Sequence, residues 1–147
     1  YGEGTRLTRQ ADITKTTSNA KKQLRENIAH YKWIDATIAA ELAVKEVLAT
    51  VNPELETLLM EMPSPPLAKL YGTILERYLG EKSPYLKQIQ KGVEIRNRLV
   101  HRHDAEAIDD QEASDYVQSI EGAIFHLLSL AHPNSLLITS ARSHVYR

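Results

Sequence analysis

Prolines divide this chain into segments of helical length, and these interruptions constrain the fold more than any other feature. They fall at Asn52-Pro53, Pro63-Ser64-Pro65-Pro66, Ser83-Pro84 and His132-Pro133. Proline restricts the residue before it and breaks a helix interior, but it is well tolerated in the first turn of a helix. Between the breaks, apolar residues recur at the three- and four-residue spacing of amphipathic helices. We therefore expect each helix to begin or end near one of these prolines.

The helical pattern extends over most of the chain. We expect helices at residues 19–51, 53–62, 67–79, 84–101 and 109–131. Gly80 should cap the third helix, and Asp109 stands three residues before Glu112, which is the spacing of an N-terminal capping box. No segment shows the alternation and turn pairs of a β-hairpin. The sequence thus predicts an all-α fold, an up-and-down bundle of about five helices.

Length and patterning set the expected domain organisation. At 147 residues the chain can form one domain with a hydrophobic core and is too short for two to be expected. We expect a polar N-terminal arm at residues 1–24, the bundle at 25–131 and a C-terminal tail at 132–147. The first long helix is apolar on two faces, so it should lie inside the bundle. These faces are Tyr31, Ile34, Ile38 and Leu42 on one side, and Trp33, Ala40, Val44, Val47 and Val51 on the other.

Composition narrows the class of protein. The chain has no cysteine, which excludes disulfides and thiolate nucleophiles and fits a cytoplasmic location. No apolar run approaches the ~18 residues of a membrane span, so we expect no membrane insertion. Phosphate-binding glycine loops and H-E-x-x-H are absent, so neither a cofactor nor a metal is expected. Because the first residue is Tyr1, we expect the chain to be processed, tagged or cut from a larger protein.

Charged residues are segregated, although the net charge is only −1. Residues 82–102 carry six Lys or Arg and one acid, whereas residues 104–115 carry six acids and no Lys or Arg. A locally basic helix attracts polyanions within ~8 Å in physiological salt, but a solvated helix face has the same composition. The sequence pI of about 6.7 argues against a dedicated DNA-binding protein.

The basic segment sets Arg96, Asn97 and His101 into an otherwise apolar helical pattern. Arginine stays cationic and histidine titrates near neutrality, so the two residue types together can bind a phosphodiester and move its protons. At about 100° per residue, Asn97 continues the core stripe of Ile89 and Val93. We therefore expect Asn97 to be buried and hydrogen-bonded.

Arg96 and His101 lie about 140° apart around such a helix and ~7.5 Å apart along it, so one straight helix does not direct both to a single phosphate. Either the helix unwinds near His101, or two copies of the helix meet and line one cleft. Ile95 and Leu99, on the face opposite the core stripe, favour the second arrangement. They would then form a homodimer interface.

The residues from Arg96 to His101 read R-N-x-x-x-H, which resembles the R-x4-6-H signature of HEPN domains. These domains are small helical bundles, often found as dimeric, metal-independent ribonucleases, and Asn directly after Arg is a frequent variant. The place of the motif is also similar, late in the penultimate helix and before a capped long helix. The resemblance covers the motif helix closely and the order of helices over residues 27–131 loosely.

The resemblance implies RNA cleavage at a site shared by two chains. His101 would be the general base or acid, Arg96 would stabilise the scissile phosphate, and Asn97 would orient one of them. The family also carries a polar residue on the first core helix, for which Glu41 and Asp35 both stay open. Supporting contacts are expected from His103, and substrate contacts from Lys91, Arg98 and Arg102.

The resemblance also implies a toxin or phage-defence setting, with RNA, an antitoxin or a fused domain as partner. In HEPN toxins paired with nucleotidyltransferase antitoxins, a modified tyrosine commonly stands two residues after the histidine; here that position is His103, which puts such regulation in doubt. Three alternatives stay open. First, the Arg-Asn pair could have a purely structural role, capping carbonyls and bridging helices. Second, His101 and His103 could form a metal pair. Third, the chain could be a non-catalytic HEPN-like module that binds a nucleotide, RNA or a protein.

Overall fold

The fold is all-α, as the sequence predicts. The computed structural model describes residues 2–63, 66–101 and 107–133, and these ranges contain no strand. The elements are α1 (Gly2–Val51), the 3-10 turn Pro53–Leu55, α2 (Glu56–Glu61), α3 (Leu67–Lys69), the π-helical turn Leu70–Ile74, α4 (Leu75–Leu79), α5 (Leu86–His101) and α6 (Asp110–Ala131). Arg102, His103 and residues 134–147 of the expected tail lie outside the described residues.

The helix ends fall where the proline and capping patterns predict. The Asn52 side chain accepts a hydrogen bond from the Glu54 amide after α1 ends. Gly80 follows α4 with φ of 94°, a left-handed conformation that glycine adopts without strain. The Asp109 side chain accepts from the Glu112 amide at 2.7 Å and caps α6.

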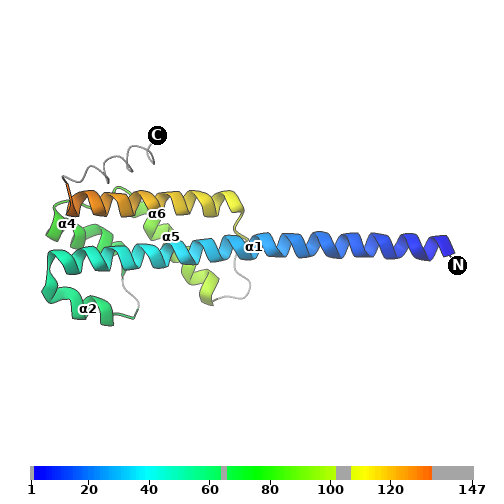
Figure 1. Cartoon of the computed structure of the whole chain (residues 1–147), viewed down its shortest axis with the longest axis horizontal. Coiled ribbons are helices and arrows are strands. Elements are labelled where there is room, and N and C mark those ends of the chain that lie inside the picture. The colour runs from blue at the N-terminus through cyan, green and yellow to red at the C-terminus, as the bar shows by residue number, and fades with distance from the viewer. Residues whose placement is uncertain (1, 64–65, 102–106, 134–147) are drawn as a thin grey trace.

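The core lies where α1 and α6 pack side by side, with α5 and the α3–α4 segment against them (Figure 1). The bent α3–α4 segment is tied to α1 by Tyr71, whose hydroxyl donates to the Ala40 carbonyl at 2.6 Å. Tyr71 is fully buried and its backbone carbonyl accepts from the Ser83 amide, which fixes the turn before α5. The start of α5 is therefore anchored to the centre of the bundle.

The first helix was predicted to begin near residue 19, but it begins at Gly2 and includes the residues expected as a polar arm. Residues 2–24 form the first part of α1, which extends well beyond the bundle (Figure 1). No proline interrupts residues 2–51, so nothing in the chain ends the helix earlier. The sequence shows little periodicity here, and residues 13–25 are all exposed.

The prediction that both apolar faces of α1 lie inside the bundle was also wrong. One face is buried, with Trp33, Ala40 and Val44 in the core. The opposite face is exposed, and Tyr31 and Leu42 have 68% and 58% of their surface in solvent. The bundle has too few helices to cover α1 on both sides.

Candidate functional site

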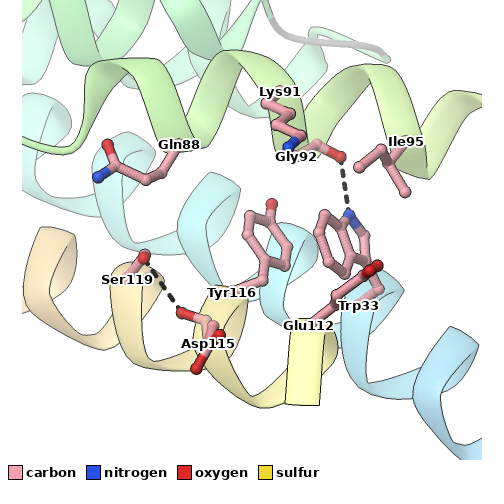
Figure 2. A pocket seen from close by; sticks show the side chains of 9 residues that line it. All are labelled: Trp33, Gln88, Lys91, Gly92, Ile95, Glu112, Asp115, Tyr116 and Ser119. Carbon is pink, nitrogen blue, oxygen red and sulfur yellow. Dashed lines mark hydrogen bonds between the residues drawn. The ribbon is translucent and has the colours of Figure 1, made fainter. Parts of the chain in front are cut away.

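Three helices meet at a fixed aromatic cluster beneath the motif helix. The Trp33 and Tyr116 rings stack with centroids 4.0 Å apart. The Trp33 indole N–H donates to the Gly92 carbonyl at 2.9 Å (Figure 2). The Tyr116 hydroxyl shares a 2.7 Å hydrogen bond with Thr37. Because all four groups are buried, the cluster fixes the position of α5 relative to α1 and α6.

Gly92 sets which face of α5 meets the core. A Cβ at this position would lie only 2.2 Å from the Tyr116 ring, so the two helices approach this closely only because glycine has none. Ile89 is fully buried one turn earlier, and Arg96 is half-buried one turn later. The core-facing stripe therefore passes through Gly92 to Arg96.

Asn97 was predicted to be buried, and the structure corrects this: its side chain is exposed. The prediction extended the stripe from Val93 to Asn97 and Val100 because it weighted apolar side chains and ignored Gly92. In the structure Val93 is only half-buried, and Val100 is 54% exposed. Asn97 is thus free to meet solvent or a ligand, and it does not hold the core together.

Ile95 and Leu99 also occupy a different face from the predicted one. Both are half-buried and pack against the hydrophobic core of their own chain, because the stripe centred on Gly92 turns this side of α5 inward. Their prediction as a face opposite the core was therefore wrong. Their role as a dimer interface stays a prediction.

Arg96 is one of three described residues, with His30 and His126, that have a buried side-chain nitrogen without a hydrogen-bond partner. Its side chain is half-buried, and its Nε atom is buried without a hydrogen-bond partner. Within the described part of the chain, no hydrogen bond or ion pair engages its guanidinium. A buried unsatisfied N–H group costs about 1–3 kcal/mol, and a buried charge costs more unless it is paired. The fold therefore holds a cation in place without supplying an anion among the residues described.

The positive charge of Arg96 acts on Tyr116. Burial raises the pKa of the Tyr116 hydroxyl above its ordinary value, while the hydrogen bond from Thr37 and the charge of Arg96 each lower it. Arg96 is thus close enough to Tyr116 for an electrostatic effect. The hydroxyl stays neutral near physiological pH, so it does not neutralise the guanidinium.

His101 is exposed at the last residue of α5. The helix is continuous to His101, so the described residues show no unwinding that would turn it toward Arg96. The two side chains remain about 140° apart around the axis and ~7.5 Å apart along it. The described residues thus do not show the first of the two expected arrangements, and the meeting of two chains stays a prediction.

The two carboxylates considered for the first core helix have different surroundings. Glu41 accepts from Lys45 at 2.9 Å in a partly buried ion pair, and the Lys45 ammonium also donates to the Met62 carbonyl. Asp35 is exposed. In the described residues neither carboxylate is hydrogen-bonded or ion-paired to Arg96, so the choice between them stays open.

The expected substrate-binding residues are only partly described. Lys91 is exposed, whereas Arg98 is half-buried and engaged in an interaction. Arg102 lies outside the described residues, as does the supporting residue His103. The metal pair of His101 and His103 is therefore not described, and no group of three or more metal-ligating side chains occurs among the described residues.

A cleft of about 430 Å³ opens above the aromatic cluster, between α5 and α6. Trp33, Gly92 and Tyr116 line its base (Figure 2). Lys91 lies on one wall, while Glu112 and Asp115 lie on the other. These two carboxylates would repel a phosphate, so the exposed end of α5 is the better place for a polyanion. The sequence places Trp33 in the core but gives no sign of this cleft, because its lining comes from three helices that only the tertiary fold brings together.

Comparisons with family models, curated proteins and solved structures found no match to this chain. Among the described residues, no helix combines the length and apolar character needed to cross a membrane. The likeness to HEPN domains consequently rests on the motif and the helix order.

Proposed function

We propose that this chain is a metal-independent endoribonuclease of the HEPN type, with a site to which two chains contribute. The observation that carries the proposal is the half-buried guanidinium of Arg96, which no acidic side chain in the described part of the chain neutralises. A phosphodiester supplies the missing anion and accepts hydrogen bonds from a guanidinium in a matching geometry. His101, exposed on the same helix, adds a group that can transfer protons.

The proposed reaction uses the ribose as its nucleophile. An imidazole from His101 removes the proton of the 2′-hydroxyl, and the 2′ oxygen then attacks phosphorus. The bond from phosphorus to the 5′ oxygen breaks, and that oxygen takes up a proton. The products are a 2′,3′-cyclic phosphate and a 5′-hydroxyl. Arg96 balances the negative charge that develops on the non-bridging oxygens.

A second chain is part of the proposal because of the geometry of α5. Arg96 and His101 of one chain diverge on a continuous helix, so each would meet the complementary residue of the other chain. Asn97 lies between the two residues in the sequence, and its side chain is exposed. It would orient the phosphate or the imidazole. The biological setting proposed is a toxin or phage-defence system, with an antitoxin or a fused domain as a further partner.

The test is cleavage of single-stranded RNA in the presence of EDTA. We expect the wild-type chain to cut and both Arg96→Ala and His101→Ala to lose activity by at least about 100-fold. Lys87→Ala is the matched control, because Lys87 is exposed on the same helix but lies more than two turns before Arg96. No cleavage by the wild type, or equal cleavage by all chains, would refute the proposal.

A second candidate function is RNA binding without cleavage. The observation that favours it is the same divergence of Arg96 and His101, because Arg96 alone suffices to bind a phosphate. This candidate predicts saturable binding that Arg96→Ala weakens and His101→Ala does not. Multiple-turnover cleavage that His101→Ala abolishes would exclude it.

A further inference from the structure

The face of α1 that points away from the bundle carries a row of large apolar side chains. We call this row the α1 seam; its residues and exposed fractions are Leu24 59%, Ile28 43%, Tyr31 68%, Ile38 46% and Leu42 58%. The positions alternate in steps of four and three residues, with Asp35 in the one remaining place. This is the spacing of a coiled-coil interface. Contiguous exposed apolar surface of this kind marks an interaction site.

We propose that the α1 seam binds a second copy of this chain, with the two α1 helices antiparallel and the two-fold axis at the level of residue 33. The seam has the symmetry that such a pairing requires. Leu24 and Leu42 are equally far from residue 33, and so are Ile28 and Ile38. An antiparallel pair therefore sets Leu24 against the partner's Leu42 and Ile28 against the partner's Ile38.

Asp35 determines the direction of the pairing. In a parallel pair, the two Asp35 carboxylates would face each other across the seam, and like charges in contact are destabilising. In the antiparallel pair, Asp35 is level with the partner's Tyr31, because both lie two residues from the centre. The tyrosine hydroxyl can donate a hydrogen bond to the carboxylate.

The charges at the ends of the seam agree with the antiparallel direction. Around Leu24 the neighbours Lys21, Lys22 and Arg25 make the helix surface net positive. Around Leu42 the surface is net negative. Lys45 is paired with Glu41, which leaves the charge of Glu46 unbalanced. Antiparallel pairing places the positive end of each helix beside the negative end of the other.

The α1 seam is prepared for binding before a partner arrives. Its helix is already formed, and the other face of the helix is buried from Ala29 to Leu48, so pairing orders little additional backbone. Covering the exposed apolar surface on both chains removes on the order of 1,000 Å² from water, the size at which stable interfaces begin. Lys32, which lies beside the centre of the seam, already forms an ion pair with Asp110 at 3.0 Å.

This inference stands on the α1 seam alone and does not depend on RNA cleavage. The seam lies on the face of α1 opposite Trp33, and Trp33 contacts α5 through Gly92. This pairing therefore leaves α5 on the outer side of each chain, and the contact that would bring Arg96 to the partner's His101 is a separate one. Ile95 and Leu99, which pack against the core of their own chain, take no part in the pairing of α1.

The first experiment measures the mass of the full chain in solution by light scattering over a range of concentrations. We expect a dimer, and we expect Ile38→Glu to weaken it by on the order of 100-fold, since two carboxylates would be buried without partners. Met60→Glu, an exposed apolar residue on α2 outside the seam, is the matched control and should leave the dimer intact. The double variant Ile28→Lys/Ile38→Glu should restore the dimer, because antiparallel pairing sets the two new charges against each other.

The second experiment determines the direction of the pairing with disulfides, for which the absence of cysteine in the chain gives a clean background. A chain with both Leu24→Cys and Leu42→Cys should cross-link rapidly into a covalent dimer. Leu24→Cys alone should not, because the two sites would be ~27 Å apart.

A wild-type chain that is monomeric at all concentrations would overturn the inference, and so would cross-linking of Leu24→Cys alone. A dimer that survives Ile38→Glu would overturn it as well. The ribonuclease proposal fails on a different result. A dimer with this pairing that does not cleave RNA would contradict the ribonuclease proposal and would agree with the pairing of α1.

Discussion

At the scale of single residues, Gly92 and Arg96 decide what α5 presents to its surroundings. Gly92 lets the Tyr116 ring rest against the backbone of α5, and this contact turns Arg96 toward the core and Asn97 toward solvent. The result is a cation held in place by packing. An unpaired charge of this kind lowers the stability of the fold. Proteins commonly keep such a group where binding or activity requires it at the expense of stability.

Gly92→Ala tests the close approach. Its methyl group would overlap the Tyr116 ring, so the helices must separate, and we expect a loss of about 2 kcal/mol in the free energy of unfolding. Chemical denaturation measures this loss. Gln90→Ala, an exposed residue of the same helix, should change the free energy by less than about 0.5 kcal/mol. A Gly92→Ala chain as stable as the wild type would show that the contact is not tight.

Arg96→Met separates a functional from a structural role for the guanidinium. Methionine keeps much of the packing and removes a charge that no described residue pairs, so we expect unchanged stability or a gain of up to about 1 kcal/mol. The same change should abolish RNA binding, measured by fluorescence anisotropy. A loss of stability above about 1 kcal/mol would instead indicate that Arg96 bridges helices, the structural alternative that the sequence left open.

The buried tyrosines predict how stability depends on pH. Burial raises the pKa of Tyr71 and of Tyr116 above the ordinary value of 10.0. The unfolded chain therefore loses these protons first, so their contribution to stability is complete below pH 10.0 and declines above it. We expect the denaturant concentration at the midpoint of unfolding to decrease as the pH is raised from about 9 to about 11. The decrease should be smaller in Tyr71→Phe. A midpoint that rises over this range would contradict the assignment.

At the scale of elements, the helix boundaries follow from local sequence. The prolines, Gly80 and Asp109 end or begin helices where the patterns predict, because capping is a matter of a few neighbouring residues. The orientation of α5 could not be predicted in the same way. It depends on Tyr116, which reaches Gly92 only through the tertiary fold. Counting apolar side chains therefore gave Asn97 the buried position that Arg96 partly occupies.

The capping of α6 is a prediction at this scale. Asp109→Ala removes the side chain that accepts from the Glu112 amide, and we expect a loss of about 1 kcal/mol in the free energy of unfolding. Ser114→Ala, exposed on the same helix, is the control and should have little effect. Equal stability of Asp109→Ala and the wild type, measured by chemical denaturation, would mean that water replaces the cap without cost.

At the scale of the whole molecule, the predicted helical bundle is confirmed, but the surface of α1 was unexpected. The sequence shows apolar residues on two faces of that helix and cannot show that, in the part of the chain described, only one of them is buried. Under our two proposals, another copy of the chain covers the exposed face of α1, and a separate contact between copies brings Arg96 and His101 together.

The most direct test of this account mixes two inactive chains. Arg96→Ala retains His101, and His101→Ala retains Arg96, so a mixed dimer has one complete site and one site without either residue. We predict no cleavage of RNA by each variant alone. After equal mixing, we predict roughly a quarter of wild-type cleavage, because half of the dimers are mixed and each has one site of two. A mixture as inactive as its components would contradict the account.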